Sequence, residues 1–149
     1  MSLLDPLKKM SKSDPHAHSR ILLTDESTTI RKRISRAMTD SLDGITYDPT
    51  NRPGISNLLE IYGHSIGRSD FAALAKEQFD GAGAKELKQK TADVLVESLT
   101  PIREEYARIM GKGPEYLEEV ARVGAVKARE SAKETMDRVR ATMGLPSLL

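Results

Sequence analysis

Apolar residues recur at helical spacing from residue 27 onward. Ile30, Ile34 and Met38 lie four residues apart, so they share one face of a predicted helix over residues 27–38, with Ser27 as its N-cap. Similar stretches predict four more helices, over residues 56–62, 69–79, 85–110 and 114–143. The pattern therefore predicts an all-α protein.

Serine, glycine and proline mark the predicted helix ends. Ser56 and Ser69 are candidate N-caps, and Gly63 is expected to end the second helix. Pro114 suits the first turn of the last helix, and Gly144 suits the left-handed position that follows its end. These residues delimit the helices of a bundle that follows an irregular arm.

Two of the predicted helices carry long apolar stripes. The stripe of the helix over residues 85–110 contains Pro101, which is expected to kink the helix. The last helix has small residues in the middle of its stripe, which would let a neighbouring helix approach closely. The residues predicted to be buried in the last helix are Val120, Gly124, Ala128, Ala132, Met136, Val139 and Met143.

Two segments lack an apolar period and are predicted to be loops. Residues 5–20 are interrupted by Pro6 and Pro15, which indicates an exposed loop. Residues 39–54 are rich in Thr, Asp, Gly, Asn and Pro, and loops of this length are usually functional or form interfaces. We therefore divide the chain into a loop arm over residues 1–25 and a helical domain over residues 26–149.

Composition narrows the class of protein. The 149 residues suffice for one domain with a modest core, and the aromatic content of 4% means that this core must be aliphatic. The chain has no cysteine, which excludes disulfides and thiolate metal sites. No apolar run approaches the roughly 20 residues of a membrane-spanning helix, so no membrane partner is expected.

Charge is balanced overall but uneven along the chain. With 23 basic and 22 acidic residues, a global electrostatic attraction to nucleic acid is not indicated. Residues 1–36, however, hold eight basic and four acidic residues, a local excess of +4. Chemistry on a polyanion is therefore best sought in the arm.

The loop within the arm contains the residues that suggest chemistry. Lys9 and Lys12, together with the hydroxyl groups of Ser11 and Ser13, could converge on a phosphate group, since an ammonium on a flexible stem can follow a phosphate as it moves. The same composition also fits a solvated basic loop. The residues alone leave both interpretations open.

His16 and His18 form a His-x-His pair in the same loop. A transition metal could use two imidazoles, but no cysteine or carboxylate cluster stands nearby at ligand spacing. We therefore predict no metal site on the protein.

The string Lys9-Met10-Ser11-Lys12-Ser13 resembles the signature loop of the class I aminoacyl-tRNA synthetases, and the similarity extends over essentially the whole chain. The other segments resemble the bacterial-type tryptophanyl enzymes. These segments are Ser2–Pro6, Asp14-Pro15, Thr39–Ser41, Arg52–Leu59, Pro101–Arg103 and Met143–Leu145. His16 departs from the asparagine that is frequent in the family. Lys12 stands where eukaryotic cytosolic members usually carry alanine, which favours a bacterial or organellar protein.

The resemblance implies a function for the loop. In such an enzyme Lys12 would be the main stabiliser of charge on the leaving pyrophosphate of ATP, and Lys9 a second phosphate ligand. Met10, Ser11 and Ser13 would shape the loop and add donors. Mg²⁺ would arrive with ATP. Tryptophan would be activated and then esterified to tRNA(Trp), with the helical domain meeting the anticodon arm and the parent enzyme forming a homodimer.

The basic residues of the last helix have two interpretations. They could contact tRNA, or they could belong to a solvated helix with ion pairs one turn apart. The residues concerned are Arg122, Lys127, Arg129, Lys133, Arg138 and Arg140.

The family's Rossmann domain, with its nucleotide motif and tryptophan pocket, precedes this loop in family members and is absent here. We therefore expect a C-terminal fragment that is inactive alone, from the cytoplasm of a bacterium or from the mitochondrial matrix of a eukaryote. A free-standing helical module that binds tRNA or a protein partner and retains the loop as a relic is the alternative. A purely structural helical protein is the third possibility.

Overall fold

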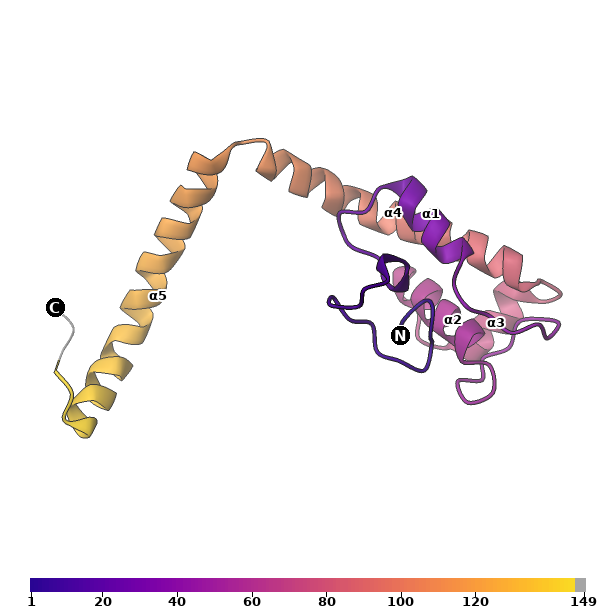
Figure 1. The fold of residues 1–149 in the computed structure, drawn as a ribbon, viewed down its shortest axis with the longest axis horizontal. Coiled ribbons are helices and arrows are strands. Elements are labelled where there is room, and N and C mark those ends of the chain that lie inside the picture. Colours follow the sequence, from indigo (N-terminus) through magenta and orange to yellow (C-terminus); the bar gives the residue numbers. More distant parts are fainter. Residues whose placement is uncertain (147–149) are drawn as a thin grey trace. The chain divides into compact units, whose positions relative to one another are not determined.

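The computed structural model describes residues 1–146, which form helices joined by loops (Figure 1). No strand occurs among these residues, so the predicted all-α class is confirmed. In chain order the elements are a short 3-10 helix η1 (Ala17–Ser19), α1 (Ser27–Ser35), α2 (Pro53–Ser65), α3 (Phe71–Phe79), α4 (Ala84–Met110) and α5 (Pro114–Met143).

Packing divides the chain between Glu105 and Tyr106. The first unit is Met1–Glu105 and the second unit is Tyr106–Leu149. By packing, the arm thus belongs with the helices that follow it. The functional division that the sequence suggested, between residues 1–25 and residues 26–149, stays a prediction.

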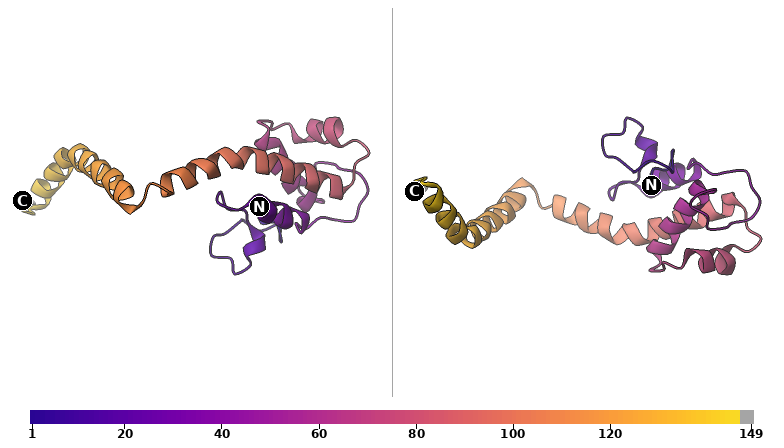
Figure 2. Two further views of the ribbon diagram at one scale, coloured as in Figure 1. Left: turned by 90° about the horizontal axis from the view of Figure 1, so that it is seen from above. Right: turned by 90° about the horizontal axis from the view of Figure 1, so that it is seen from below.

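The core of the first unit is almost wholly aliphatic, as the low aromatic content requires. Ile30 and Ile34 of α1, Leu58 of α2 and Leu87 of α4 are buried in one cluster. The three helices that carry these residues lie together in Figures 1 and 2. Leu3 of the arm joins this cluster and is 1% exposed. The arm is therefore anchored in the helical core and is not a free appendage.

Backbone hydrogen bonds fix the arm to its neighbours. The N–H of Leu3 donates to the carbonyl oxygen of Ser19 at 2.9 Å, and its own carbonyl accepts from the N–H of Met38 at 2.7 Å. The N–H of Ser2 donates to the carbonyl of Lys8, which closes the segment before the loop over residues 8–19, here called the lysine loop. These bonds hold both ends of the loop over residues 8–19.

The predicted start and end of α1 and the predicted start of α2 were wrong. The N-cap of α1 is Glu26 in place of Ser27, and α1 ends at Ser35, so Met38 lies outside it and is exposed. Pro53, whose ring fixes φ, starts α2 three residues before Ser56. The Ser56 hydroxyl therefore does not cap α2 and instead accepts a hydrogen bond from the N–H of Asp48 at 2.9 Å.

Gly63 does not end α2, and Ser69 does not cap α3. Gly63 lies inside α2, where a Cβ would come within 2.9 Å of the Phe71 ring. The glycine thus serves close packing between α2 and α3 instead of chain reversal. The N-cap position of α3 is occupied by Asp70.

A buried arginine orders the long loop between α1 and α2. The Arg52 guanidinium, 7% exposed, forms a two-pronged ion pair with Asp40, in which Nη2 lies 2.7 Å from Oδ1 and Nε lies 3.1 Å from Oδ2. It also donates to the carbonyl oxygens of Leu42 and Gly44 and to the hydroxyl of Thr46. These bonds hold the segment around Asp40 against Arg52, so both segments stabilise the fold of this loop.

The apolar stripe of α4 is buried only in its first half. Leu87 and Thr91 are fully buried, whereas Ile102 and Tyr106 are about half exposed. The helix runs through Pro101 without interruption, and the kink expected there stays a prediction.

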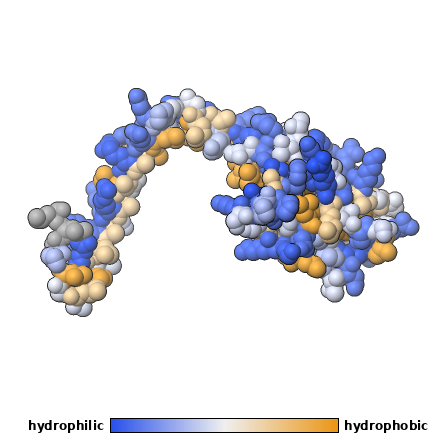
Figure 3. Space-filling model, in the orientation of Figure 1, coloured by the Kyte–Doolittle hydropathy of each residue, from blue (hydrophilic) through white to orange (hydrophobic). Residues whose placement is uncertain are grey.

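The predicted burial of the α5 face was wrong. The bounds of α5 match the prediction, and Gly144 takes the expected left-handed conformation with φ of 70°. Yet no residue of α5 is buried, and the apolar residues that run along one side of it in Figure 3 are exposed. Within the second unit only the last turn of α4 accompanies α5, and this is too little to cover its apolar side. None of the helices among the described residues is long and apolar enough to span a membrane.

Candidate functional site

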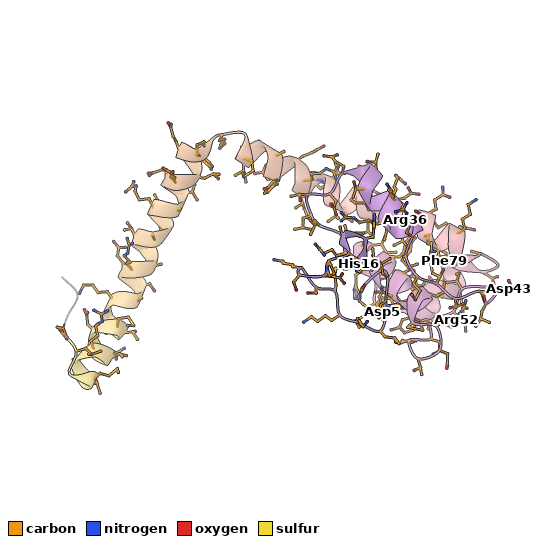
Figure 4. The ribbon with its side chains drawn as sticks, viewed as in Figure 1. Asp5, His16, Arg36, Asp43, Arg52 and Phe79 are labelled. Atoms are coloured by element: carbon orange, nitrogen blue, oxygen red, sulfur yellow. The ribbon has the colours of Figure 1, made fainter. Side chains whose placement is uncertain are left out.

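The lysine loop borders a hollow of about 460 Å³ in the first unit. Its lining combines the start of the arm with the loop and consists of Ser2, Leu4, Asp5, Lys8, Lys9, Ser11, Ser13, Asp14, Pro15 and His16. Figure 4 labels two of these lining residues, Asp5 and His16. Of the five residues that the sequence singled out, the structure brings Lys9, Ser11 and Ser13 to this hollow. Met10 and Lys12 are exposed outside its lining.

Lys12 lies in a tight turn whose two ends are Ser11 and Asp14. The N–H of Asp14 donates to the carbonyl oxygen of Ser11 at 3.4 Å, which is long for such a bond. The hydroxyl of Ser11 lies 3.0 Å from that of Ser13 and accepts from the Ser13 N–H at 3.3 Å. The turn therefore directs the Lys12 side chain outward, and its internal hydrogen bonds alone hold it weakly.

The lysines of this loop differ in whether their charge is neutralised. The Lys8 ammonium forms an ion pair with Asp5 at 2.8 Å, which lowers the pKa of Asp5 and raises that of Lys8. Neither Lys9 nor Lys12 forms a hydrogen bond or an ion pair through its ammonium with any residue of the described range 1–146. Two ammonium groups three residues apart in the chain thus remain available to an anion.

The carboxylate of Asp14 is engaged within the loop. It accepts the N–H of His16 at 2.8 Å, and this bond holds the pKa of Asp14 below its ordinary value of 3.8, with the nearby His16 ring adding to the effect. The acid at the end of the turn therefore stays ionised, and the contacts of its carboxylate are with His16.

The two histidines do not act together. The Nε2 atom of His18 lies 3.4 Å from Nη1 of Arg36, whereas Nδ1 of His16 lies 3.4 Å from the Asp14 carboxylate. Within residues 1–146 no three or more metal-ligating side chains gather. The described residues thus offer no protein cage for a metal.

Sequence reasoning missed two arginines that support the turn. Nη1 of Arg20 donates to the carbonyl oxygens of Asp14 and Ser11, and Nη1 of Arg33 donates to the carbonyl oxygen of Arg20 itself. No spacing rule could have found these contacts, because their acceptors are backbone carbonyls that only the folded chain brings near.

A second hollow, of about 410 Å³, lies between α1 and α4 and contains none of the residues singled out from the sequence. Arg31, Lys85 and Lys88 are among its lining residues. Burial lowers the pKa of Lys88, whose ammonium reaches the carbonyl oxygen of Ser35 at 3.5 Å. Ser35 also lines this hollow, and its hydroxyl donates to the carbonyl oxygen of Lys32 at 2.9 Å.

The comparisons with known proteins all find similarity to aminoacyl-tRNA synthetases. Residues 1–100 match the family model described as tRNA synthetases class I (W and Y). The chain is similar to tryptophan–tRNA ligases of Halalkalibacterium halodurans, at 41% identity, and of Bacillus subtilis, at 39% identity, in each case over 145 residues. The alignments cover 97% of this chain and 43% of each relative.

A solved structure supports the same relationship. The crystal structure of tryptophanyl-tRNA synthetase from Mycoplasma pneumoniae superposes with a TM-score of 0.83 at 26% identity, covering 99% of this chain and 44% of that one. The chain spans less than half the length of the relatives that it matches.

Proposed function

The chain belongs to the class I tRNA synthetases of the tryptophan and tyrosine group, and on that premise we propose that it supplies the phosphate-binding loop and the helical tRNA-binding part of a tryptophan–tRNA ligase. The observation that carries this proposal is the pair of un-neutralised ammonium groups of Lys9 and Lys12. Lys12 stands in the turn from Ser11 to Asp14, and Lys9 precedes this turn and lines the hollow of about 460 Å³.

In the first reaction of such an enzyme, positive charge is needed most where the pyrophosphate departs. The tryptophan carboxylate oxygen bonds to the α-phosphorus of ATP, and the bond from that phosphorus to the bridging oxygen breaks. Negative charge then moves onto the departing pyrophosphate. Lys12 would stabilise this charge most directly and Lys9 would be the second ligand, with Ser11, Ser13 and the loop around Met10 adding donors and shape.

Magnesium has a different place in this proposal. The described residues offer no cluster of three metal ligands, and Mg²⁺ is commonly held by substrate phosphates with only one or two carboxylates. We therefore assign the ion to the nucleotide, where it supplies charge neutralisation for the triphosphate. The chain's own contribution is the pair of ammonium groups and the hydroxyls beside them.

We propose that the helical part contacts tRNA(Trp), and that some of the basic residues of α5 form ion pairs within the helix instead. Arg122 pairs with Glu119 at 2.7 Å and Lys133 pairs with Asp137 at 2.7 Å, one turn apart on α5. These two side chains fit the solvated-helix interpretation. Contact with the nucleic acid would then rest on the basic residues without such pairs and on the helical surface as a whole.

A chimera tests the proposal. This chain would replace the matching segment of the Bacillus subtilis tryptophan–tRNA ligase, and tryptophan-dependent ATP–pyrophosphate exchange would be measured. The chimera should be active and the chain alone inactive, since catalysis requires ATP and tryptophan to be held together. Activity of the chain alone would contradict the assignment of tryptophan binding to other parts of the ligase.

The role of the loop has its own test in the same chimera. Lys12→Ala should slow tryptophan activation by roughly 10²–10³-fold, the usual loss on removal of one preorganised charge stabiliser, and Lys9→Ala should do so more mildly. Equilibrium binding of tryptophan should not change, because the loop meets phosphate. Lys32→Ala removes a charge from α1 that has no partner in the described range and serves as the control. Weakened tryptophan binding with an intact activation rate in Lys12→Ala would show that the loop has another role.

A further inference from the structure

The turn that carries Lys12 needs support from outside itself. Its closing backbone bond, from the Asp14 N–H to the Ser11 carbonyl, is 3.4 Å long, and its remaining bonds join two exposed serines. An exposed turn with bonds of this length opens readily in water, because solvent competes for every donor and acceptor. A lysine that must stabilise charge at one place requires a more rigid support.

Arg20 supplies such a support. Its Nη1 atom lies 2.9 Å from the carbonyl oxygen of Asp14 and 3.4 Å from that of Ser11, so one nitrogen contacts both ends of the turn. The first contact has normal hydrogen-bond geometry and the second is weaker. The guanidinium forms no ion pair with any carboxylate of residues 1–146. The two hydrogen bonds that Nη1 of Arg20 donates thus both go to the turn.

Arg20 is itself held by the helices. Its carbonyl oxygen accepts a hydrogen bond from Nη1 of Arg33 on α1 at 3.0 Å. Arg33 is ion-paired with Asp25, and both side chains are only 11% exposed, so the pair is shielded from competing water. The position of Arg20 is therefore set by the buried part of α1.

A further bond extends the same network to α4. The carbonyl oxygen of Asp25 accepts from Nη1 of Arg103 at 3.1 Å, and Nη2 of Arg103 donates to the hydroxyl of Thr100 at 3.1 Å. A continuous set of hydrogen bonds thus leads from α4 through Asp25 and Arg33 to Arg20 and the turn. Each bond in it joins groups of the first unit.

We propose that Arg20 is a positioning residue that clasps the Ser11–Asp14 turn and thereby fixes where Lys12 presents its ammonium to phosphate. The clasp itself rests on geometry alone. Its consequence for catalysis rests on the function proposed above for Lys12. Arg20 does not touch phosphate in this proposal and acts through the backbone of the turn.

The clasp can be tested on the chain as it is, without any assay of activity. Amide ¹⁵N relaxation and hydrogen exchange would be measured for the parent chain, Arg20→Ala and Lys32→Ala. In Arg20→Ala the amides of residues 11–14 should lose order on the nanosecond timescale and exchange faster, while those of α1 and α2 remain as in the parent. Lys32→Ala should match the parent. Equal order of the turn in all three proteins would overturn the clasp.

The catalytic consequence requires the Bacillus subtilis chimera. Arg20→Ala should lower kcat for tryptophan activation by roughly 10–100-fold, the loss expected when a reacting group is misplaced by about an ångström, with KM for tryptophan unchanged. Added to Lys12→Ala, the same change should have little further effect, because no ammonium is left to position. Fully additive losses would refute a role through Lys12.

The outcomes also separate this inference from the proposed function. If the chimera is inactive while the turn of Arg20→Ala loses order, the assignment to tryptophan activation fails and the clasp stands. If the chimera is active and sensitive to Lys12→Ala while Arg20→Ala changes neither order nor kcat, the proposed function stands and the clasp fails.

Discussion

Gly54→Ala should destabilise the first unit although alanine is the better helix former. Gly54 is the second residue of α2, and a Cβ built on it would lie 2.3 Å from the carbonyl oxygen of Met38 and 3.1 Å from the Cα of Thr39. Ordinary contacts of a Cβ begin near 3.4 Å, so the overlap with the carbonyl is 3.4 − 2.3, about 1.1 Å. Both neighbouring groups belong to the backbone and cannot turn away as a side chain could.

The magnitude follows from two opposing effects. Forcing extra atoms into a packed site costs about 1–3 kcal/mol, and the larger figure applies here because the Met38 segment is held by its hydrogen bond to Leu3. Removing glycine from a helix returns about 0.5–1 kcal/mol. The expected net change is therefore a loss of about 2 kcal/mol in the free energy of unfolding.

Urea unfolding followed through the amide resonances of α1 and α2 measures this loss. Gly124→Ala is the matched control, since Gly124 lies inside α5 with nothing within 4 Å of its built Cβ. That variant should raise the helix content of α5 and leave the midpoint of the first unit unchanged. An unchanged or higher midpoint for Gly54→Ala would refute the close contact between the start of α2 and the segment after α1.

Three further outcomes are expected. Arg52 holds the pKa of Asp40 below its ordinary value of 3.8. The ion pair therefore contributes stability that is fully present above pH 3.8 and is lost as the pH falls further. Urea midpoints measured between about pH 6 and 2 should fall less steeply in Asp40→Asn than in the parent chain. The exposed apolar side of α5 should cause self-association that sedimentation detects as concentration-dependent, and Val120→Lys should weaken it, whereas a monomer at every concentration would argue against an apolar contact surface. The chain should bind tRNA weakly and lose that binding steeply as salt rises, because phosphate contacts dominate; titrations at two salt concentrations that give equal affinity would favour a purely structural protein.

The sequence predicted the two long helices well because their ends are marked locally. The predicted helix over residues 114–143 coincides with α5, since Pro114 and Gly144 act on the backbone in which they stand. The start of α2 was missed because two local signals compete there, and the proline at position 53 prevails over the serine at position 56. A capping residue or a proline therefore predicts a helix end reliably only where no second such residue stands nearby.

Burial and the details of the site were less predictable, for a different reason. Periodicity identified the apolar side of α5 but not whether anything covers it, because burial is a property of the neighbours. The loop residues Lys9 and Lys12 were singled out from their string alone, and their role stays a prediction. The pairing of Lys8 with Asp5, and the contacts of Arg20, depend on distances that only the fold sets.

The hydrogen-bond and ion-pair partners of the residues around the lysine loop explain how the arm retains a positive electrostatic field. A carboxylate that braced the turn would also cancel one of its charges, since an ion pair at contact distance neutralises most of the field beyond it. Arg20 instead braces the turn through the neutral carbonyls of Ser11 and Asp14, so its own charge adds to those of Lys9 and Lys12. The nearby carboxylates meanwhile have other partners, because Asp5 pairs with Lys8 and Asp25 pairs with Arg33. The same set of contacts thus makes the turn rigid and leaves its charge available, which are the two conditions for stabilising an anion by preorganised charge.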